Sequence, residues 1–276
     1  MLLKEWYTHK KTFLIPLWVI SVIYILSLLG YIYGSLRYGA PNMINGVPNP
    51  AQLDLVLWSI HYGSAIFIAW LCLLTSVSLV DVCLNQDQQK RCEIFHLSQP
   101  VSLMKILGSK ALFCVLGVFI QYMLISALNY LVLGSVLAIV GYPSFALGFN
   151  ALLNTMPYMI SALLLIVPLM WIFSSMFRKA PFVKLMLFFA VYEVIRFMLE
   201  AAWSLKLFSI LGYYNRLVFA PFEILSRFSG NRGLINFSLV NWNWNWSASW
   251  DQLIWFGINV ALVIASYFIY KRRNIS

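Results

Sequence analysis

The longest stretch without charge sets the strongest limit on how this chain can fold. Between Lys110 and Arg178 lie 67 residues, none of which is Asp, Glu, Lys or Arg. A helix of roughly 20 apolar residues is enough to cross a bilayer, so this stretch is far too long for one span. Segment 141–154 contains Gly, Pro, Ser and Asn and provides a turn within it. We therefore expect two membrane spans here, at about 108–140 and 153–177.

Composition extends this conclusion to the whole chain. Hydrophobic residues make up 62% of the 276 residues and charged residues only 10%, with a mean hydropathy of +0.81. Soluble domains carry about 25% charged residues, so the sequence predicts an all-α, polytopic membrane protein whose surroundings are a lipid bilayer. The formal net charge of +10 does not indicate nucleic acid as a partner, because cytoplasmic loops of membrane proteins are rich in Lys and Arg.

Charged and turn-forming residues divide the chain into six expected spans, which together form a single transmembrane domain, residues 1–276. The spans are expected at about 13–35, 59–81, 108–140, 153–177, 182–204 and 251–270. Residues 1–12 have an amphipathic pattern and are expected to form an interfacial helix, with a disordered basic start as the alternative. Between the spans lie a polar loop, 82–107, and an outer loop or re-entrant segment, 205–249.

The distribution of Lys and Arg predicts the orientation of these spans. Thirteen of the nineteen fall in the N-terminus, the stretch around Pro100 up to Lys110, the turn at 178–184 and the C-terminus. Five fall on the opposite side, and Arg196 lies within an expected span. Because positive charge accumulates on the cytoplasmic side, both termini and the 82–107 loop are expected in the cytoplasm, which an even number of spans allows. We expect a multi-pass protein of the bacterial inner membrane or plasma membrane.

The 82–107 loop is a short polar insert between two long apolar segments. Pro100 interrupts it, and Ser102 is a suitable cap for a new helix that runs through Lys105 into the third span. A helix–Pro–helix of this size is too short to be a domain. Its size suits a short binding element for a soluble partner, and an ordinary solvated loop is the alternative.

The sequence HLSQPVSLMKILGSKALF, which begins in this loop, resembles the first cytoplasmic loop of ABC-2 type transporter permeases. The residues that match the family's pattern are Leu97, Ser98, Pro100, Val101, Ser102 and Lys110. Asp87 stands where the family usually has Glu. Gln88 replaces a basic residue of the pattern, and Arg91 with Cys92 replaces a Gly-Thr pair.

This resemblance implies that the chain is the membrane subunit of an ATP-driven ABC exporter. In such an exporter the loop is a coupling helix that docks on a separate ATPase subunit, and two membrane subunits, identical or sibling chains, work with two ATPase copies. ATP and Mg²⁺ would bind the partner, so this chain is not expected to be an enzyme by itself or to hold a cofactor. The sequence contains no G-x-x-x-x-G-K-[ST] phosphate-binding loop. The residues implied to contact the ATPase are Asp87, Arg91 and Glu93 as polar contacts, Ile94, Phe95 and Leu97 as an apolar face, and Pro100, which fixes the angle to the third span.

The expected fifth span is the only one that carries charges away from its ends. Glu193, Arg196 and Glu200 are spaced by three and four residues, which places them on one face of a helix. Charges within a membrane usually pair with each other and face a bundle interior or an aqueous cavity. This face is either a structural ion pair or a substrate contact. It would also be the polar centre if the chain were an intramembrane enzyme, a channel or a secondary transporter. No metal site is expected, because the three His residues are scattered and no H-E-x-x-H motif occurs.

An alternation of Asn and Trp occupies residues 241–246 in the outer segment. In an extended chain it would place Trp242, Trp244 and Trp246 on one face. Because Trp prefers the membrane interface, an aromatic belt is one interpretation, and a substrate-facing aromatic patch is the other.

Overall fold

Helices account for nearly all of the part of the chain that the structure describes. The computed structural model describes residues 2–38, 50–89, 103–139, 141–177, 179–204, 209 and 250–275. Within these ranges there is no β-strand. The elements are α1 Leu2–Tyr38, α2 Pro50–Gln89, α4 Leu103–Leu112, a π-helical turn η1 Phe113–Gly117, α5 Val118–Ile139, α6 Phe145–Met176, α7 Pro181–Trp203 and α9 Trp250–Ile275.

Four described segments are long and apolar enough to cross a membrane. They are His9–Gly30 in α1, Val56–Asn85 in α2, Met104–Ile139 across α4, η1 and α5, and Phe145–Met176 in α6. These four correspond to the first four spans that the sequence predicts, so an all-helical chain with four candidate spans is confirmed. Six spans stay a prediction. A multi-pass membrane protein is compatible with this structure.

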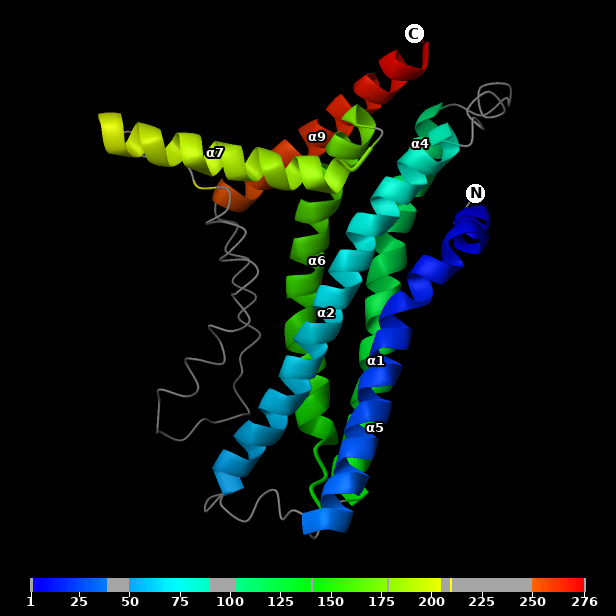
Figure 1. The fold of residues 1–276 in the computed structure, drawn as a ribbon, viewed down its shortest axis with the longest axis vertical. Helices are drawn as coiled ribbons and strands as arrows, with labels where there is room; N and C mark the ends of the chain where they lie inside the picture. Colours follow the sequence, from blue (N-terminus) through cyan, green and yellow to red (C-terminus); the bar gives the residue numbers. More distant parts are fainter. Residues whose placement is uncertain are drawn as a thin grey trace.

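The beginning of the chain differs from the prediction. The expected interfacial helix 1–12 and the expected first span form one helix, α1, with Pro16 inside it. Figure 1 shows the first part of α1 tilted away from the rest. A proline has no backbone N–H and its ring crowds the preceding turn, which bends a helix without ending it in a membrane protein. The amphipathic start is therefore continuous with the first span.

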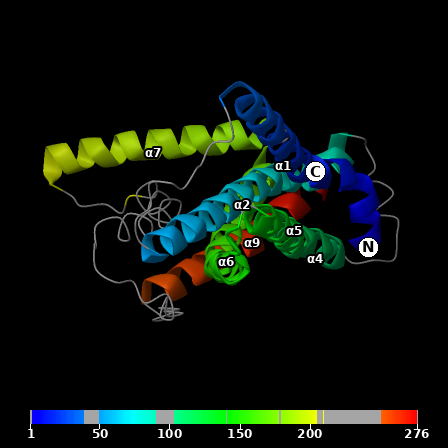
Figure 2. The ribbon, with the colours of Figure 1, turned by 90° about the horizontal axis from the view of Figure 1, so that it is seen from below.

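The bundle of α1, α2, α5 and α6 forms the centre of the molecule, with the most extensive contact between α2 and α6 (Figures 1 and 2). On α2, Ala65, Ala69, Cys72 and Ser76 follow one another at spacings of four, three and four, and all four are buried. This spacing places them on one helix face. Small side chains let helix backbones approach closely, and van der Waals packing then stabilises the contact where no water remains to be released.

The third predicted span contains one irregular turn. The five residues Phe113–Gly117 form a π-helical turn between α4 and α5, and Phe113 and Cys114 within it are buried. At Gly117 an added Cβ would lie 3.1 Å from Cζ of Phe13, so glycine allows α1 to pass close to this turn. A π turn holds one extra residue without breaking the helix.

Helices α7 and α9 are arranged differently from the four bundle helices. In Figure 1 α7 begins near the end of α6 and projects sideways, away from the bundle, rather than running alongside α6, and its far end also lies beyond the bundle in Figure 2. Its bounds, Pro181–Trp203, nearly coincide with the predicted span 182–204, but it carries Lys184, Glu193, Arg196 and Glu200. It is not among the four apolar helices, because these charges lower its apolar character. Helix α9, which includes the predicted span 251–270, packs against α6.

Both ends of the chain lie at the same end of the bundle. Figure 1 places the N-terminus and the C-terminus near the end of α2 and the start of α4. The turn between α5 and α6 lies at the opposite end. This arrangement is compatible with the prediction that both termini and the 82–107 loop share one side of the membrane.

Candidate functional site

The middle half of the predicted coupling loop, residues 90–102, lies outside the described residues. Helix α2 continues to Gln89, beyond the predicted end of the second span at 81, so the first third of the 82–107 loop is helical. Asp87 is therefore in the last turns of α2. The remaining residues expected to contact the ATPase, Arg91, Glu93, Ile94, Phe95, Leu97 and Pro100, lie in 90–102, outside the described residues. The chain is described again from Leu103, where α4 begins.

A buried lysine connects the two helices that flank this loop. Lys110 of α4 is 4% exposed, and its Nζ donates a hydrogen bond of 2.5 Å to the carbonyl oxygen of Cys83 on α2. Lys105, one and a half turns earlier on the same helix, is exposed. Buried charges are costly in an apolar medium unless they are hydrogen-bonded. The side chain of Lys110 is therefore held against α2 rather than extended toward water.

The end of α6 joins the same region through Asn85. Its Nδ2 donates to Oδ1 of Asp81 at 2.5 Å and, over a longer 3.4 Å, to the carbonyl oxygen of Phe177. Phe177 is the residue that follows α6, where helix carbonyls lack partners within the helix. The ring of Phe177 in turn lies 4.0 Å, centroid to Nζ, from Lys184 of α7. We refer to Asp81, Cys83, Asn85, Lys110 and Phe177 as the Lys110 junction.

The charged residues of α7 come together as their spacing predicts. Nε of Arg196 donates to Oε2 of Glu193 at 2.7 Å, and Nη1 donates to Oε2 of Glu200 at 2.9 Å. Oγ of Ser209 donates to the other oxygen of Glu193 at 2.9 Å. The side chains of Arg196 and Glu193 are 22% and 18% exposed, and that of Glu200 is 44% exposed. One cation between two carboxylates leaves the face with a single net negative charge.

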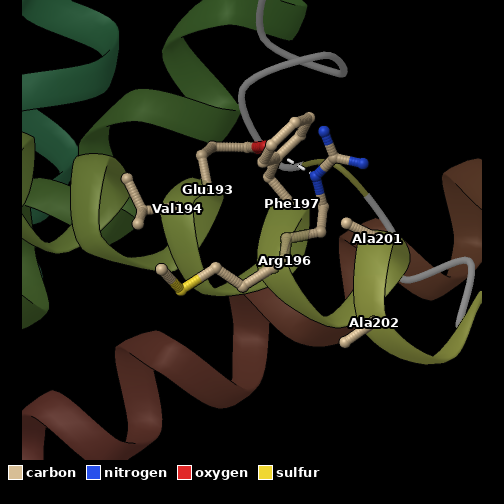
Figure 3. Close-up of a pocket in the computed structure, with 7 residues that line it drawn as sticks. Glu193, Val194, Arg196, Phe197, Ala201 and Ala202 are labelled. Atoms are coloured by element: carbon tan, nitrogen blue, oxygen red, sulfur yellow. Dashed lines mark hydrogen bonds and ion pairs between the residues drawn. The ribbon is translucent and has the colours of Figure 1, made fainter.

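A shallow depression lies beside these charges (Figure 3). It is lined by Glu193, Val194, Arg196, Phe197, Met198, Ala201 and Ala202. All seven residues belong to α7. The depression is open and formed by one helix, so it does not enclose a ligand. The predicted aromatic patch of Trp242, Trp244 and Trp246 lies outside the described residues.

A chain of polar side chains that we did not single out from the sequence crosses the bundle interior. Oη of Tyr24 on α1 donates to Oδ1 of Asn129 on α5, whose Nδ2 donates to Oγ of Ser64 on α2 at 3.0 Å. His61, on the same face of α2, is 3% exposed, and its Nε2 lies 2.9 Å from Oγ of Ser144. Ser144 precedes α6 without capping it through its hydroxyl. These bonds connect α1, α2, α5 and the start of α6.

The signal for this chain of bonds was present but weak. Asn129 and His61 are polar residues in otherwise apolar spans, and such residues usually face the bundle interior. The two partners of Asn129 are 65 and 105 residues away in sequence, and the partner of His61 is 83 residues away. Periodicity along one helix does not identify partners on another. The bonds satisfy polar groups that lipid would leave unpaired, and they fix the four helices relative to one another.

Metal chemistry has no candidate centre in the described part of the chain. No group of three or more His, Cys, Asp or Glu side chains there is placed to hold a metal ion. The side chains of Cys72, Cys83 and Cys114 are buried. In comparisons with known proteins, no family model, no curated protein and no solved structure matches this chain.

Proposed function

We propose that this chain is the membrane subunit of an ATP-driven exporter of the ABC-2 type. One observation carries the proposal: the Leu97–Ser102 sequence that resembles the family's coupling loop lies between two candidate membrane spans, Val56–Asn85 and Met104–Ile139. A loop in this position can be reached by a soluble partner. Movement of the loop would act directly on two membrane helices.

The proposed mechanism divides the work between two kinds of subunit. A separate ATPase binds ATP and Mg²⁺, because this sequence has no phosphate-binding loop of its own. Closure of the ATPase dimer displaces the coupling loop, and the membrane helices follow as rigid bodies between inward-facing and outward-facing arrangements. A second membrane subunit, either another copy or a sibling chain, completes the transporter. We place it in the bacterial inner membrane or plasma membrane, with both termini in the cytoplasm.

The coupling loop provides the direct test of this function. A helix that docks in a groove obtains most of its affinity from a few apolar anchors, while charges at the rim contribute less. Phe95→Ala should therefore reduce copurification of the ATPase at least tenfold, and Arg91→Ala, the matched rim variant, should reduce it less. Pro100→Ala should leave copurification intact and impair the response of the membrane helices to ATP. Equal copurification of the ATPase with Phe95→Ala and with the unmodified chain would contradict the proposal.

The paired charges on α7 support a second candidate, a secondary transporter or channel. Glu193 and Glu200 both contact Arg196, so the binding of a cation at either carboxylate would compete with the guanidinium. The same face would be the polar centre of an intramembrane enzyme. An ion flux through vesicles that contain the purified chain alone, without any ATPase, would favour the second candidate over the exporter.

A further inference from the structure

The position of Lys110 is unusual for a lysine near a membrane boundary. Such lysines normally extend their charged ends toward water, as the exposed Lys105 on the same helix does. Lys110 is 4% exposed and instead donates to a backbone carbonyl of α2, 27 residues earlier in the chain. A lysine that served only to orient the protein in the membrane would have no need of this buried contact.

Asn85 is unusual in the opposite way, because part of it lacks a partner. Its Nδ2 bonds Asp81 and reaches the carbonyl oxygen of Phe177 at the end of α6, but its buried Oδ1 has no hydrogen-bond partner among the described residues. A buried carbonyl oxygen without a donor destabilises the folded protein. An apolar residue at this position would avoid that cost but would lose the bond to α6.

The junction joins three helix ends at one place. Cys83 and Asn85 lie near the end of α2, Lys110 lies near the start of the third candidate span, and Phe177 follows α6. The segment that connects α2 to α4 begins a few residues after Cys83 and Asn85 and ends a few residues before Lys110. Hydrogen bonds in a low-dielectric interior hold two elements in a fixed geometry more firmly than the same bonds in water.

We propose that Lys110 and Asn85 are positioning residues that transmit movement of the coupling loop to α6 and to the far end of the bundle. The inference rests on the proposed function, since it requires an ATPase that moves the loop. Lys110 fixes α4 to α2, so the two helices that flank the loop move as one body. Asn85 fixes that body to the end of α6, and α7 follows directly after it.

The test measures movement at both ends of the bundle in the complex of the full chain with its ATPase. One pair of nitroxide labels, at Met104→Cys and Met176→Cys, reports on the junction end, and both sites are exposed. A second pair, at Leu29→Cys and Ile139→Cys, uses exposed residues near the ends of α1 and α5. Pulsed electron spin resonance gives each distance with and without ATP and Mg²⁺, in a chain whose native cysteines are replaced by Ser.

The decisive variants are Lys110→Met and Asn85→Leu, with Lys105→Met as the matched control on the same helix. In the unmodified complex and in Lys105→Met, ATP should shift the far-end distance and leave the junction-end distance constant, because α4 and the end of α6 move as one body. In Lys110→Met the junction-end distance should change with ATP and the far-end shift should fall at least fourfold, with copurification of the ATPase unchanged. Lys110→Arg keeps a donor for the Cys83 carbonyl and should recover most of the far-end shift. A lysine with a purely structural role would not lower the far-end shift while leaving copurification of the ATPase unchanged.

Each remaining outcome has a defined meaning. If ATPase copurifies and Lys110→Met or Asn85→Leu shows the same far-end shift as Lys105→Met, the inference is wrong while the proposed function stands. If no ATPase copurifies with the unmodified chain, the proposed function fails and the inference fails with it. If neither variant can be recovered in folded form, the junction is structural, which also overturns the inference.

Discussion

The contact of α6 with α2 and α5 at Gly148 gives the most quantitative prediction. Gly148 is buried in the first turn of α6, where a Cβ would lie 2.7 Å from Cδ2 of Tyr130 and 2.9 Å from Cε1 and Nδ1 of His61. Ordinary contacts of a Cβ begin near 3.4 Å. In Gly148→Ala both rings must therefore move. His61 has little freedom to do so, because its Nε2 is bonded to Ser144 at 2.9 Å.

Three contributions determine the size of the effect. Overpacking of a filled interior costs about 1–3 kcal/mol. Weakening of the His61–Ser144 hydrogen bond costs about 1 kcal/mol more. Alanine in place of glycine inside a helix returns about 1 kcal/mol. Gly148→Ala should therefore lower the free energy of unfolding by about 1–3 kcal/mol, which corresponds to roughly 2–4 °C in Tm per kcal/mol for a chain of this size class.

The control is Gly63→Ala on α2, close to His61 in sequence. A Cβ at Gly63 meets nothing within 4 Å, so only the helix-propensity gain of about 1 kcal/mol applies. Thermal unfolding of both purified variants in detergent micelles, followed by circular dichroism, gives the comparison. We expect Gly148→Ala to unfold several degrees below the unmodified chain and Gly63→Ala at or above it. If Gly148→Ala is as stable as Gly63→Ala, the close contact of Gly148 with Tyr130 and His61 does not exist.

Two further predictions concern topology and the charged face of α7. Cys92 should react with a membrane-impermeant thiol reagent only from the cytoplasmic side, and a cysteine introduced by Asn243→Cys should react only from outside. The labelling is selective because Cys72, Cys83 and Cys114 are buried. The reverse labelling pattern would overturn the predicted orientation. Removal of Arg196 alone should lower Tm more than the joint replacement of Glu193, Arg196 and Glu200 by apolar residues, because Arg196→Met leaves two carboxylates without the cation that pairs with both. Equal Tm values would show that the pairing contributes nothing.

The sequence predicted the elements that depend on local pattern. The charge-free stretch between Lys110 and Arg178 predicted two long helical segments, and the first ends where expected, at Ile139. The second, α6, begins at Phe145 rather than at about 153, so most of the expected turn 141–154 is helical. The pairing on α7 was also predictable, because residues three and four apart on a helix are always neighbours. Boundaries were less accurate: α2 runs to Gln89, since polar residues after a span can continue a helix beyond the membrane.

Contacts between distant parts of the chain were not predictable from pattern alone. The bond of Lys110 to Cys83 joins residues 27 apart, and that of His61 to Ser144 joins residues 83 apart. Periodicity specifies which face of a helix is buried but not the rotation and height of the neighbouring helix. Those depend on packing, which here includes a stripe of small residues on α2 and the π turn between α4 and α5.

The π turn makes the third candidate span two helical rods with separate rotational settings. Each residue of an α-helix turns the chain by about 100°, and the turn at Phe113–Gly117 inserts one residue more than a regular helix would hold. Loss of a single residue in the regular helix on either side would rotate Lys110 by about 100° relative to Tyr122. Loss of the exposed Leu116 would instead remove the extra residue and let the turn close into a regular α-helix, with Lys110 and Tyr122 near their present faces. A one-residue deletion should therefore disturb the span less at this turn than elsewhere along it.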